Sequence, residues 1–221
     1  MTASSRCSDT TTPHAVPATA RLIVLEGMPG AGKTTAAAAL AGQGHSVIGE
    51  YTSDSDATIA IAAHPAITDD DAHQANWPRK AAQCADRLTS RPIVYADRDW
   101  LSSLSYAYSA DDGNLLARRA AWATRHLSAG TLLLPSAYAV FDLDPAASIA
   151  RRATRLRPGH PWNHPAALER LRRFYLDPAA CLRPVSPELA AALSVPAWTA
   201  VSGHDEPAVT LARIESLARP A

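Results

Sequence analysis

The sequence contains little lysine, little cysteine and no excess charge of either sign. Only Lys33 and Lys80 are lysines among its 21 basic residues, and 21 acidic residues bring the formal net charge to +0. The charge balance therefore argues against binding to a nucleic-acid polymer or to a polycation. The chain otherwise uses arginine and is rich in alanine, which indicates a genomic bias. Against that bias, the lysine at position 33 is informative.

The cysteine pattern and the terminal composition exclude other classes. Cys7, Cys84 and Cys181 are widely spaced and form neither a disulfide framework nor a metal-binding pattern, as is typical of a reducing cytoplasm. No apolar run approaches the length of a membrane span. Residues 1–18 are rich in Ser, Thr and Pro and lack the apolar segment of a targeting signal. We therefore expect a disordered tail followed by one cytoplasmic domain over residues 19–221.

A glycine-rich turn follows the first apolar run of the chain. This strand, turn and helix order, ending in Gly-Lys-Thr, is typical of a phosphate-binding loop. Glycines let consecutive N–H groups surround a phosphate, and the helix start adds free amides and the positive end of its dipole. The predicted nucleotide-binding residues are Gly27, Met28, Pro29, Gly30, Ala31, Gly32, Lys33, Thr34 and Thr35.

The chemistry of this loop predicts ATP and Mg²⁺ as ligands. Lys33 would neutralise β- and γ-phosphate oxygens, and the hydroxyl of Thr34 would ligate Mg²⁺. The loop carries Met28 and Pro29 and no arginine of its own. We therefore expect an arginine from a mobile lid to complete the site.

Strand and helix patterns alternate along the rest of the chain, which predicts an α/β fold with a parallel sheet covered on both faces. Ligands in such sheets bind beyond the carboxyl ends of the strands. The expected strands are 21–25, 46–50, 93–96, 138–143 and 195–201. The expected helices are 34–41, 72–88 with a break near Pro78, 100–108, 115–128, 145–156, 166–176 and 206–218.

Polar residues end the second and third expected strands. Glu50 ends one, and Asp97 and Arg98 end the other, so both should meet the phosphate-binding loop at one rim. Asp97 can hold the metal or receive a proton, while Arg98 can grip an anionic acceptor. A guanine-reading Asn-Lys-x-Asp is absent, and a motor would normally carry paired acids here. A small kinase is therefore favoured over a GTPase or a motor.

Several segments resemble thymidylate kinases. Residues Asp97–Tyr108 read DRDWLSSLSYAY and resemble the Asp-Arg-Tyr…Ser-Ser…Ala-Tyr-Gln signature of that family. The loop with its preceding Leu-Glu-Gly, the Leu134–Pro145 segment and the Leu171–Leu176 segment resemble its other motifs in the same order. The similarity spans roughly residues 20–218. It implies a P-loop nucleoside monophosphate kinase fold with a five-stranded parallel sheet, ATP, Mg²⁺ and a closing lid.

The resemblance also implies roles for particular residues. Arg98 would clamp the phosphate of the acceptor, and Ser102 or Ser103 would lie beside that acceptor. The lid would occupy about residues 151–165 and supply arginines to the transferring phosphoryl group, where fixed guanidinium groups stabilise the spreading charge. The candidates are Arg151, Arg152, Arg155 and Arg157, with Arg151 also assigned to nucleotide binding. The family further implies a homodimer, although the sequence shows no interface pattern.

Departures from the family pattern concern the acceptor. The family's Phe-x-x-x-Arg base-reading pair is replaced by a neighbourhood in which Trp77 could stack on the acceptor and Arg79 could bond to it. The aromatic residue after Asp-Arg is replaced by Asp99. We therefore expect a nucleotide- or nucleoside-like acceptor other than thymidine monophosphate.

Glu50 leaves two acceptor types open. Nucleoside kinases of the deoxynucleoside type place a glutamate at the end of the second strand, and such a carboxylate can take the proton of a hydroxyl acceptor. With Glu50 as base, or Asp97 or Asp99 in its place, the protein would be a hydroxyl kinase for a nucleoside-type natural product or antibiotic. Otherwise Glu50 orders the loop or pairs with Arg98. An alternative of another class is a non-catalytic nucleotide-binding regulatory module.

Overall fold

A five-stranded parallel sheet organises the chain. The computed structural model describes residues 17–51, 70–154 and 161–219. The strands stand in the order β2-β3-β1-β4-β5, and every neighbouring pair is parallel. The predicted fold class is therefore confirmed. The strands are β1 (Arg21–Gly27), β2 (Ser46–Ile48), β3 (Ile93–Asp97), β4 (Ala137–Asp142) and β5 (Ala197–Ser202).

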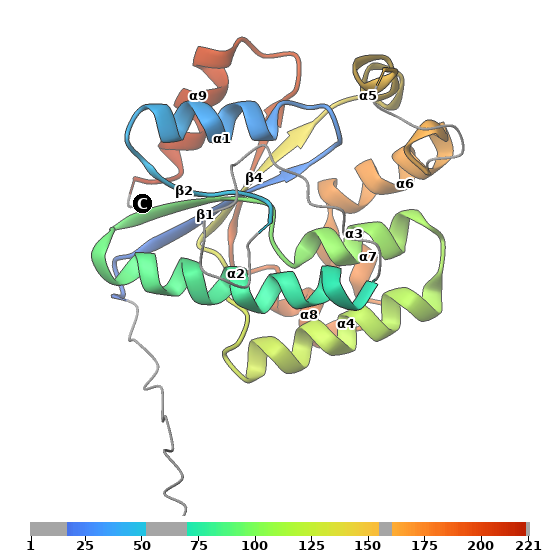
Figure 1. Ribbon diagram of the computed structural model, residues 1–221. Helices are drawn as coiled ribbons and strands as arrows, with labels where there is room; N and C mark the ends of the chain where they lie inside the picture. Colours follow the sequence, from blue (N-terminus) through green and yellow to red (C-terminus); the bar gives the residue numbers. More distant parts are fainter. Residues whose placement is uncertain (1–16, 52–69, 155–160, 220–221) are drawn as a thin grey trace, which may run out of the picture.

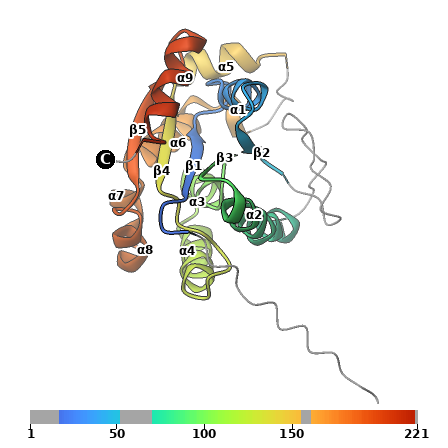
Figure 2. The same ribbon diagram turned by 90° about the vertical axis from the view of Figure 1, so that its left-hand side faces the viewer.

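Helices cover both faces of this sheet. In Figure 1, α1 and α9 lie above it, whereas α2, α3, α4, α7 and α8 lie below, and Figure 2 shows the same layers from the side. The helices are α1 (Lys33–Gly42), α2 (Asp70–Ser90), α3 (Leu101–Ser109), α4 (Gly113–Ser128), α5 (Pro145–Arg152), α6 (Pro165–Leu176), α7 (Pro178–Leu182), α8 (Pro187–Ala192) and α9 (Pro207–Ser216), with a 3₁₀ turn η1 (Pro161–Asn163).

Burial on both faces explains the apolar character of the central strand. Ile23, Val24 and Leu25 of β1 are fully buried, as expected for a parallel strand between two helical layers. Proline sets the start of several helices, because its fixed φ suits the first turn and its missing N–H is not needed there. The helices α5, α6, α7, α8 and α9 all begin with proline.

The helical layer differs from the prediction in two places. Helix α2 continues through Pro78 instead of breaking there. Proline costs a helix interior about 3 kcal/mol, and the burial of Trp77, Cys84 and Leu88 on the same helix offsets this cost. The short helices α7 and α8 were not predicted. Each has at most two turns, which is too short for a helical period to stand out.

Two predicted features fall largely outside the described residues. These are most of the tail over residues 1–18 and the central part of the lid, which includes Arg155 and Arg157. Across the described ranges, no helix combines the length and apolar character that crossing a bilayer requires.

Candidate phosphoryl-transfer site

The phosphate-binding loop is shaped by close backbone approach. Gly27 has φ 125°, and an added Cβ would lie 2.2 Å from the carbonyl oxygen of Phe141 on β4. Gly30 has φ 74°, again in the region that favours glycine. Within the described ranges, the amides of Gly30, Gly32 and Lys33 donate to no backbone carbonyl. The loop therefore offers N–H groups to an anion at the start of α1.

Lys33 folds back over this loop. Its Nζ donates to the carbonyl oxygens of Gly27 at 3.0 Å and Met28 at 2.7 Å. Burial, and after it the positive charge of Arg98, lowers the pKa of Lys33 to about 7. A phosphate in the loop would add negative charge beside this ammonium and favour its protonated form.

Thr34 and Asp97 meet where a metal ion would bind. The Thr34 hydroxyl donates to Oδ2 of Asp97 at 2.8 Å. The other oxygen, Oδ1, is buried and has no hydrogen-bond partner among the described residues. No group of three or more His, Cys, Asp or Glu side chains suited to a metal occurs in that part of the chain. Mg²⁺ needs only one or two protein oxygens when phosphates and water supply the rest, so the pair fits Mg²⁺.

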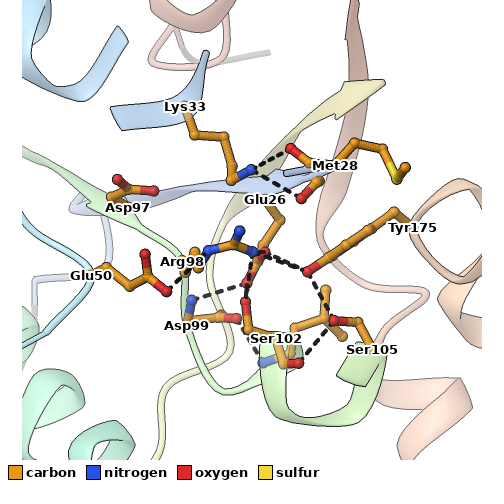
Figure 3. A network of polar contacts seen from close by, with 12 residues as sticks. Glu26, Met28, Lys33, Glu50, Asp97, Arg98, Asp99, Ser102, Ser105 and Tyr175 are labelled. Atoms are coloured by element: carbon orange, nitrogen blue, oxygen red, sulfur yellow. Dashed lines mark hydrogen bonds and ion pairs between the residues drawn. The ribbon is translucent and has the colours of Figure 1, made fainter. Parts of the chain in front are cut away.

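A fully buried carboxylate, Glu26 at the end of β1, organises the neighbouring residues (Figure 3). Its Oε1 accepts from the Ser102 hydroxyl at 2.7 Å and the Asp99 amide at 3.1 Å. Its Oε2 accepts from the Tyr175 hydroxyl at 2.9 Å and from Arg98 Nη1 at 3.2 Å. Both oxygens are therefore fixed, as a buried charge requires.

Arg98 lies between two glutamates. Besides the contact with Glu26, its Nε lies 3.2 Å from Oε1 of Glu50. Burial opposes the charge of Arg98, but Glu50, Tyr175 and Glu26 outweigh it and raise its pKa. The residue has φ 66°, an uncommon conformation for a residue with a side chain. This turn at the end of β3 is stabilised by the amide of Arg98, which donates to Leu25 O at 3.0 Å.

Asp99 is already engaged in structural contacts. Its Oδ1 accepts from the amide of Leu101 at 2.8 Å, and its Oδ2 accepts from the hydroxyl of Tyr138 at 2.9 Å. Burial and the charge of Glu26 raise the pKa of Asp99 to about 7. These contacts tie the start of α3 to β4, which leaves Glu50 and Asp97 as the better placed carboxylates of the site.

Lys80 on α2 was not predicted to belong to the site. Its buried Nζ donates to the carbonyl oxygens of Gly49 and Asp97, both at 2.6 Å. Glu26 was likewise not predicted to have a role. The signal for Glu26 is a carboxylate that directly follows four apolar strand residues, and the signal for Lys80 is that the chain has only two lysines.

Four aromatic side chains form a cluster, and two of them, Tyr51 and Tyr106, lie close enough to Glu50 and Arg98 to interact with their charges. The rings of Tyr106 and Trp162 meet edge to face at 4.7 Å, and His73 lies 6.5 Å from Tyr106 and 6.2 Å from Tyr51. Burial raises the pKa of Tyr106, while the charges of Arg98 and Arg152 oppose that rise. We call Tyr51, His73, Tyr106 and Trp162 the aromatic cluster.

The four residues predicted to lie near the acceptor, besides Glu50 and Arg98, come from α2 and α3. Ser102 joins the Glu26 network, whereas Ser103 is bound to Gln74 of α2 through its hydroxyl and to Arg119 of α4 through its carbonyl. Trp77 is 1% exposed, and its ring meets that of His73 edge to face at 5.1 Å, so it adjoins the aromatic cluster from the core side. Arg79 lies half-buried on α2.

The lid arginines lie against the loop where they are described. Arg151 donates to the carbonyl oxygens of Gly30 at 3.2 Å and Gly203 at 2.9 Å, joining the phosphate-binding loop to the segment after β5. The stem of Arg152 lies beside Gly30. Both arginines therefore stand at the nucleotide side of the site.

Solved structures share this architecture at low sequence identity. Deoxyadenosine kinase from M. mycoides with bound dATP is 12% identical, with a TM-score of 0.55, covering 88% of this chain and 97% of that one. The same enzyme with the products dCMP and a flexible dCDP is 13% identical, with the same TM-score and coverage. No curated protein sequence matches the chain. The predicted nucleoside- and nucleotide-kinase type of fold is therefore confirmed.

A family model matches the part of the chain that carries these residues. The model described as "AAA domain" matches residues 22–174, from β1 to α6. This range contains the phosphate-binding loop, Glu50, Asp97 and Arg98, and more than half of the chain. The chain accordingly belongs to this AAA domain family of phosphate-binding-loop proteins.

Proposed function

We propose that the protein is an ATP- and Mg²⁺-dependent phosphotransferase that phosphorylates a hydroxyl group of a nucleoside-like small molecule. The loop amides and Lys33 hold the β- and γ-phosphates, and Thr34 and Asp97 hold Mg²⁺, which supplies charge neutralisation at the transferring phosphoryl group. Arg152, and Arg155 and Arg157 once the lid closes, stabilise that group. Arg151 orders the nucleotide side.

The observation that favours a hydroxyl over a phosphate acceptor is the position of Arg98 between Glu26 and Glu50. A phosphate clamp needs a guanidinium that is available to a dianion. Here two carboxylates already neutralise that guanidinium, and a phosphate approaching Arg98 would meet the negative charge of Glu50. A neutral hydroxyl meets no such repulsion, and Glu50 can take its proton.

The aromatic cluster supports an acceptor that carries a planar ring. Its rings come from α2, α3, η1 and the residue after Glu50, and two of them, Tyr51 and Tyr106, interact with the charges of Glu50 and Arg98. Aromatic side chains bind planar rings by stacking with little dependence on the ring's identity. Trp77 and Arg79, one or two turns along α2, would act behind this first layer.

The test is ATP consumption with a panel of nucleosides, nucleoside monophosphates and ring-bearing alcohols. We expect turnover with an alcohol, and we expect Glu50→Gln to lower kcat at least about 100-fold, the usual scale of a lost general base. The matched control is Glu188→Gln on the exposed start of α8, which should keep full activity. Turnover confined to monophosphates, or a Glu50→Gln variant at full rate, would overturn the hydroxyl assignment.

Arg98→Ala distinguishes the second acceptor type. With a hydroxyl acceptor, the variant should chiefly lower kcat, because Glu50 loses its partner. With a monophosphate acceptor, it should chiefly raise KM for the acceptor, because the clamp is lost. An absence of turnover with every acceptor, combined with tight ATP binding, would favour a non-catalytic nucleotide-binding regulatory module.

A further inference from the structure

Lys80 is the only lysine outside the phosphate-binding loop, and its side chain is 2% exposed. It lies in the middle of α2 and reaches the sheet rather than solvent. Its ammonium donates to Gly49 O at 2.6 Å, Asp97 O at 2.6 Å and Glu50 O at 3.4 Å. An ammonium has three donors and no acceptor, so these carbonyls occupy its full bonding capacity.

The three carbonyls mark the point where two strands separate. The pairing of β2 with β3 ends at Ile48 and Ala96, immediately before Gly49 and Asp97. Beyond that pair, the backbone hydrogen bonds between β2 and β3 cannot fix the distance between the two segments that follow these strands. Lys80 therefore takes the place of the next backbone hydrogen bond between the strands and joins both segments to α2. Asn76, one turn earlier, adds a bond of 3.1 Å to Glu50 O.

The surroundings of Lys80 penalise its charge. Burial lowers the pKa of Lys80, which shows that the surroundings disfavour the ammonium. Lys80→Met would remove this buried charge but also leave three carbonyl oxygens without this donor, so a test of Lys80 needs a readout that a loss of stability alone would not change. A cavity of about 20 Å³ adjoins Lys80 and is lined mainly by apolar groups, including Val24, Trp77 and Ala81. A methionine could occupy this region.

We propose that Lys80 is a positioning residue that fixes Glu50 and Asp97 relative to each other by holding the backbone carbonyls behind both carboxylates. The Glu50 part of this inference rests on the proposed function. The Asp97 part rests on nucleotide and metal binding alone, so it can be tested without an acceptor.

The first experiment measures ADP affinity with and without Mg²⁺ in the full-length chain. We expect the factor by which Mg²⁺ increases ADP affinity to be at least fivefold smaller in Lys80→Met than in the native chain. The ADP affinity without Mg²⁺ should agree between the two proteins within about twofold. The matched control is Arg87→Met. Arg87 lies on the same helix and donates to Val47 O at 2.9 Å. The substitution therefore removes a hydrogen bond between α2 and β2 that does not involve the backbone of Glu50 or Asp97. It should preserve both affinities within about twofold.

The second experiment uses the best acceptor from the panel. Lys80→Met should lower kcat at least about 30-fold with little change in KM for ATP, and Arg87→Met should stay within about twofold. If Lys80→Met does not fold, Lys80→Gln, which keeps one donor group, is compared with Arg87→Gln in the same way.

The outcomes separate this inference from the proposed function. An equal Mg²⁺ effect on ADP binding in the native chain and the Lys80 variant, including none in either, overturns the positioning role. If the variant loses ADP affinity equally with and without Mg²⁺, the positioning role is also overturned, because such a loss indicates general damage to the nucleotide site. Loss of the Mg²⁺ effect in the variant, with no turnover by the native chain, supports Lys80 and rejects the kinase.

Discussion

The nucleotide half and the acceptor half of the site are built in different ways. The nucleotide half consists mainly of consecutive residues 27–35, whose amides, lysine and hydroxyl share one turn and the start of α1. The acceptor half joins residues from distant segments. Glu26 and Tyr175, which are hydrogen-bonded, lie 149 positions apart in the sequence.

The two halves differ in where their charged side chains find partners. The partners are close in sequence in the nucleotide half and distant in sequence in the acceptor half. In the loop, the ammonium of Lys33 donates to the carbonyl oxygens of Gly27 and Met28, which are six and five residues away. In the acceptor half, the charge of Arg98 depends on Glu26 from β1 and on Glu50 after β2. We therefore expect substitutions in the loop to act on function with little loss of stability, and substitutions in the acceptor half to act on both.

The largest expected effect is on catalysis in the nucleotide half. Lys33→Met should lower turnover at least about a thousand-fold, because the transferring phosphate loses a fixed positive charge. The free energy of unfolding should stay equal or rise by about 1–2 kcal/mol, because a buried charge is removed. ATP consumption and urea denaturation measure the two quantities. Full turnover in this variant would contradict the assigned role of the loop.

The corresponding change in the acceptor half is Glu26→Gln. It leaves Arg98 with one carboxylate fewer and breaks part of a buried network, so it should lower the free energy of unfolding by about 3 kcal/mol. Turnover should fall about 100-fold as Arg98 and Glu50 shift. Urea denaturation checks the first value, with Glu188→Gln as the surface control. A variant as stable as that control would remove the proposed contrast between the halves.

A pH experiment sharpens the account of Lys33. With a pKa of about 7, Lys33 is mostly neutral at pH 8, and a bound phosphate favours its protonated form. Nucleotide binding should therefore take up about 0.9 proton at pH 8 and about 0.1 at pH 6. Calorimetry in two buffers of different ionisation enthalpy measures this uptake. Lys33→Met should abolish it, and uptake that persists in that variant would assign the proton to another group.

The same pKa predicts a direction for the stability of the free protein. The folded-state pKa is lower than the unfolded value of 10.5, so the unfolded chain binds more protons between about pH 7 and pH 10.5. The Lys33 contribution should therefore raise the free energy of unfolding as the pH rises through this window. The difference between native chain and Lys33→Met should narrow accordingly in urea denaturation from pH 7 to pH 10.

The smallest expected effect concerns an ion pair that joins α6 to the end of β4. Arg172 of α6 contacts Asp142 at the end of β4 through Nε at 2.6 Å and Nη2 at 2.8 Å. Both side chains are partly exposed, so Arg172→Gln should cost only about 0.5–1 kcal/mol at pH 7.

The pH dependence of this effect provides its control. The hydrogen bond from Arg172 lowers the pKa of Asp142, so the pair stabilises the fold above the unfolded pKa of the carboxyl and loses that effect as the pH falls. The difference between native chain and Arg172→Gln should shrink below about pH 4. A difference that persists at pH 3 would mean that Arg172 acts through packing of its stem instead.

Local signals were sufficient for the fold and for several site residues. The strand, glycine turn and helix pattern predicted the loop. The strand ends predicted that Glu50, Asp97 and Arg98 lie at the same edge of the sheet, and in the structure Arg98 contacts Glu50 while Asp97 contacts Thr34 of the loop. Their catalytic roles stay predictions. These features were predictable because parallel strands end on one edge of the sheet.

Long-range contacts account for what was missed. Trp77 was expected to meet the acceptor, and this stays a prediction, but its burial by the packing of α2 on the sheet was not predicted. Glu26 gained its partners only when α3 and α6 came to β1. Neither burial nor partner choice can be read from neighbours in sequence, because both depend on how elements pack.

The sequence by itself determined an α/β chain with a phosphate-binding loop, since glycine conformation, the lysine and the helix start act over a few neighbouring residues. Only the tertiary structure decided that Arg98 lies between two glutamates and that Lys80 joins the ends of β2 and β3. The physical reason is that a buried charge needs partners, and those of Arg98 and Lys80 come from segments that only folding brings together.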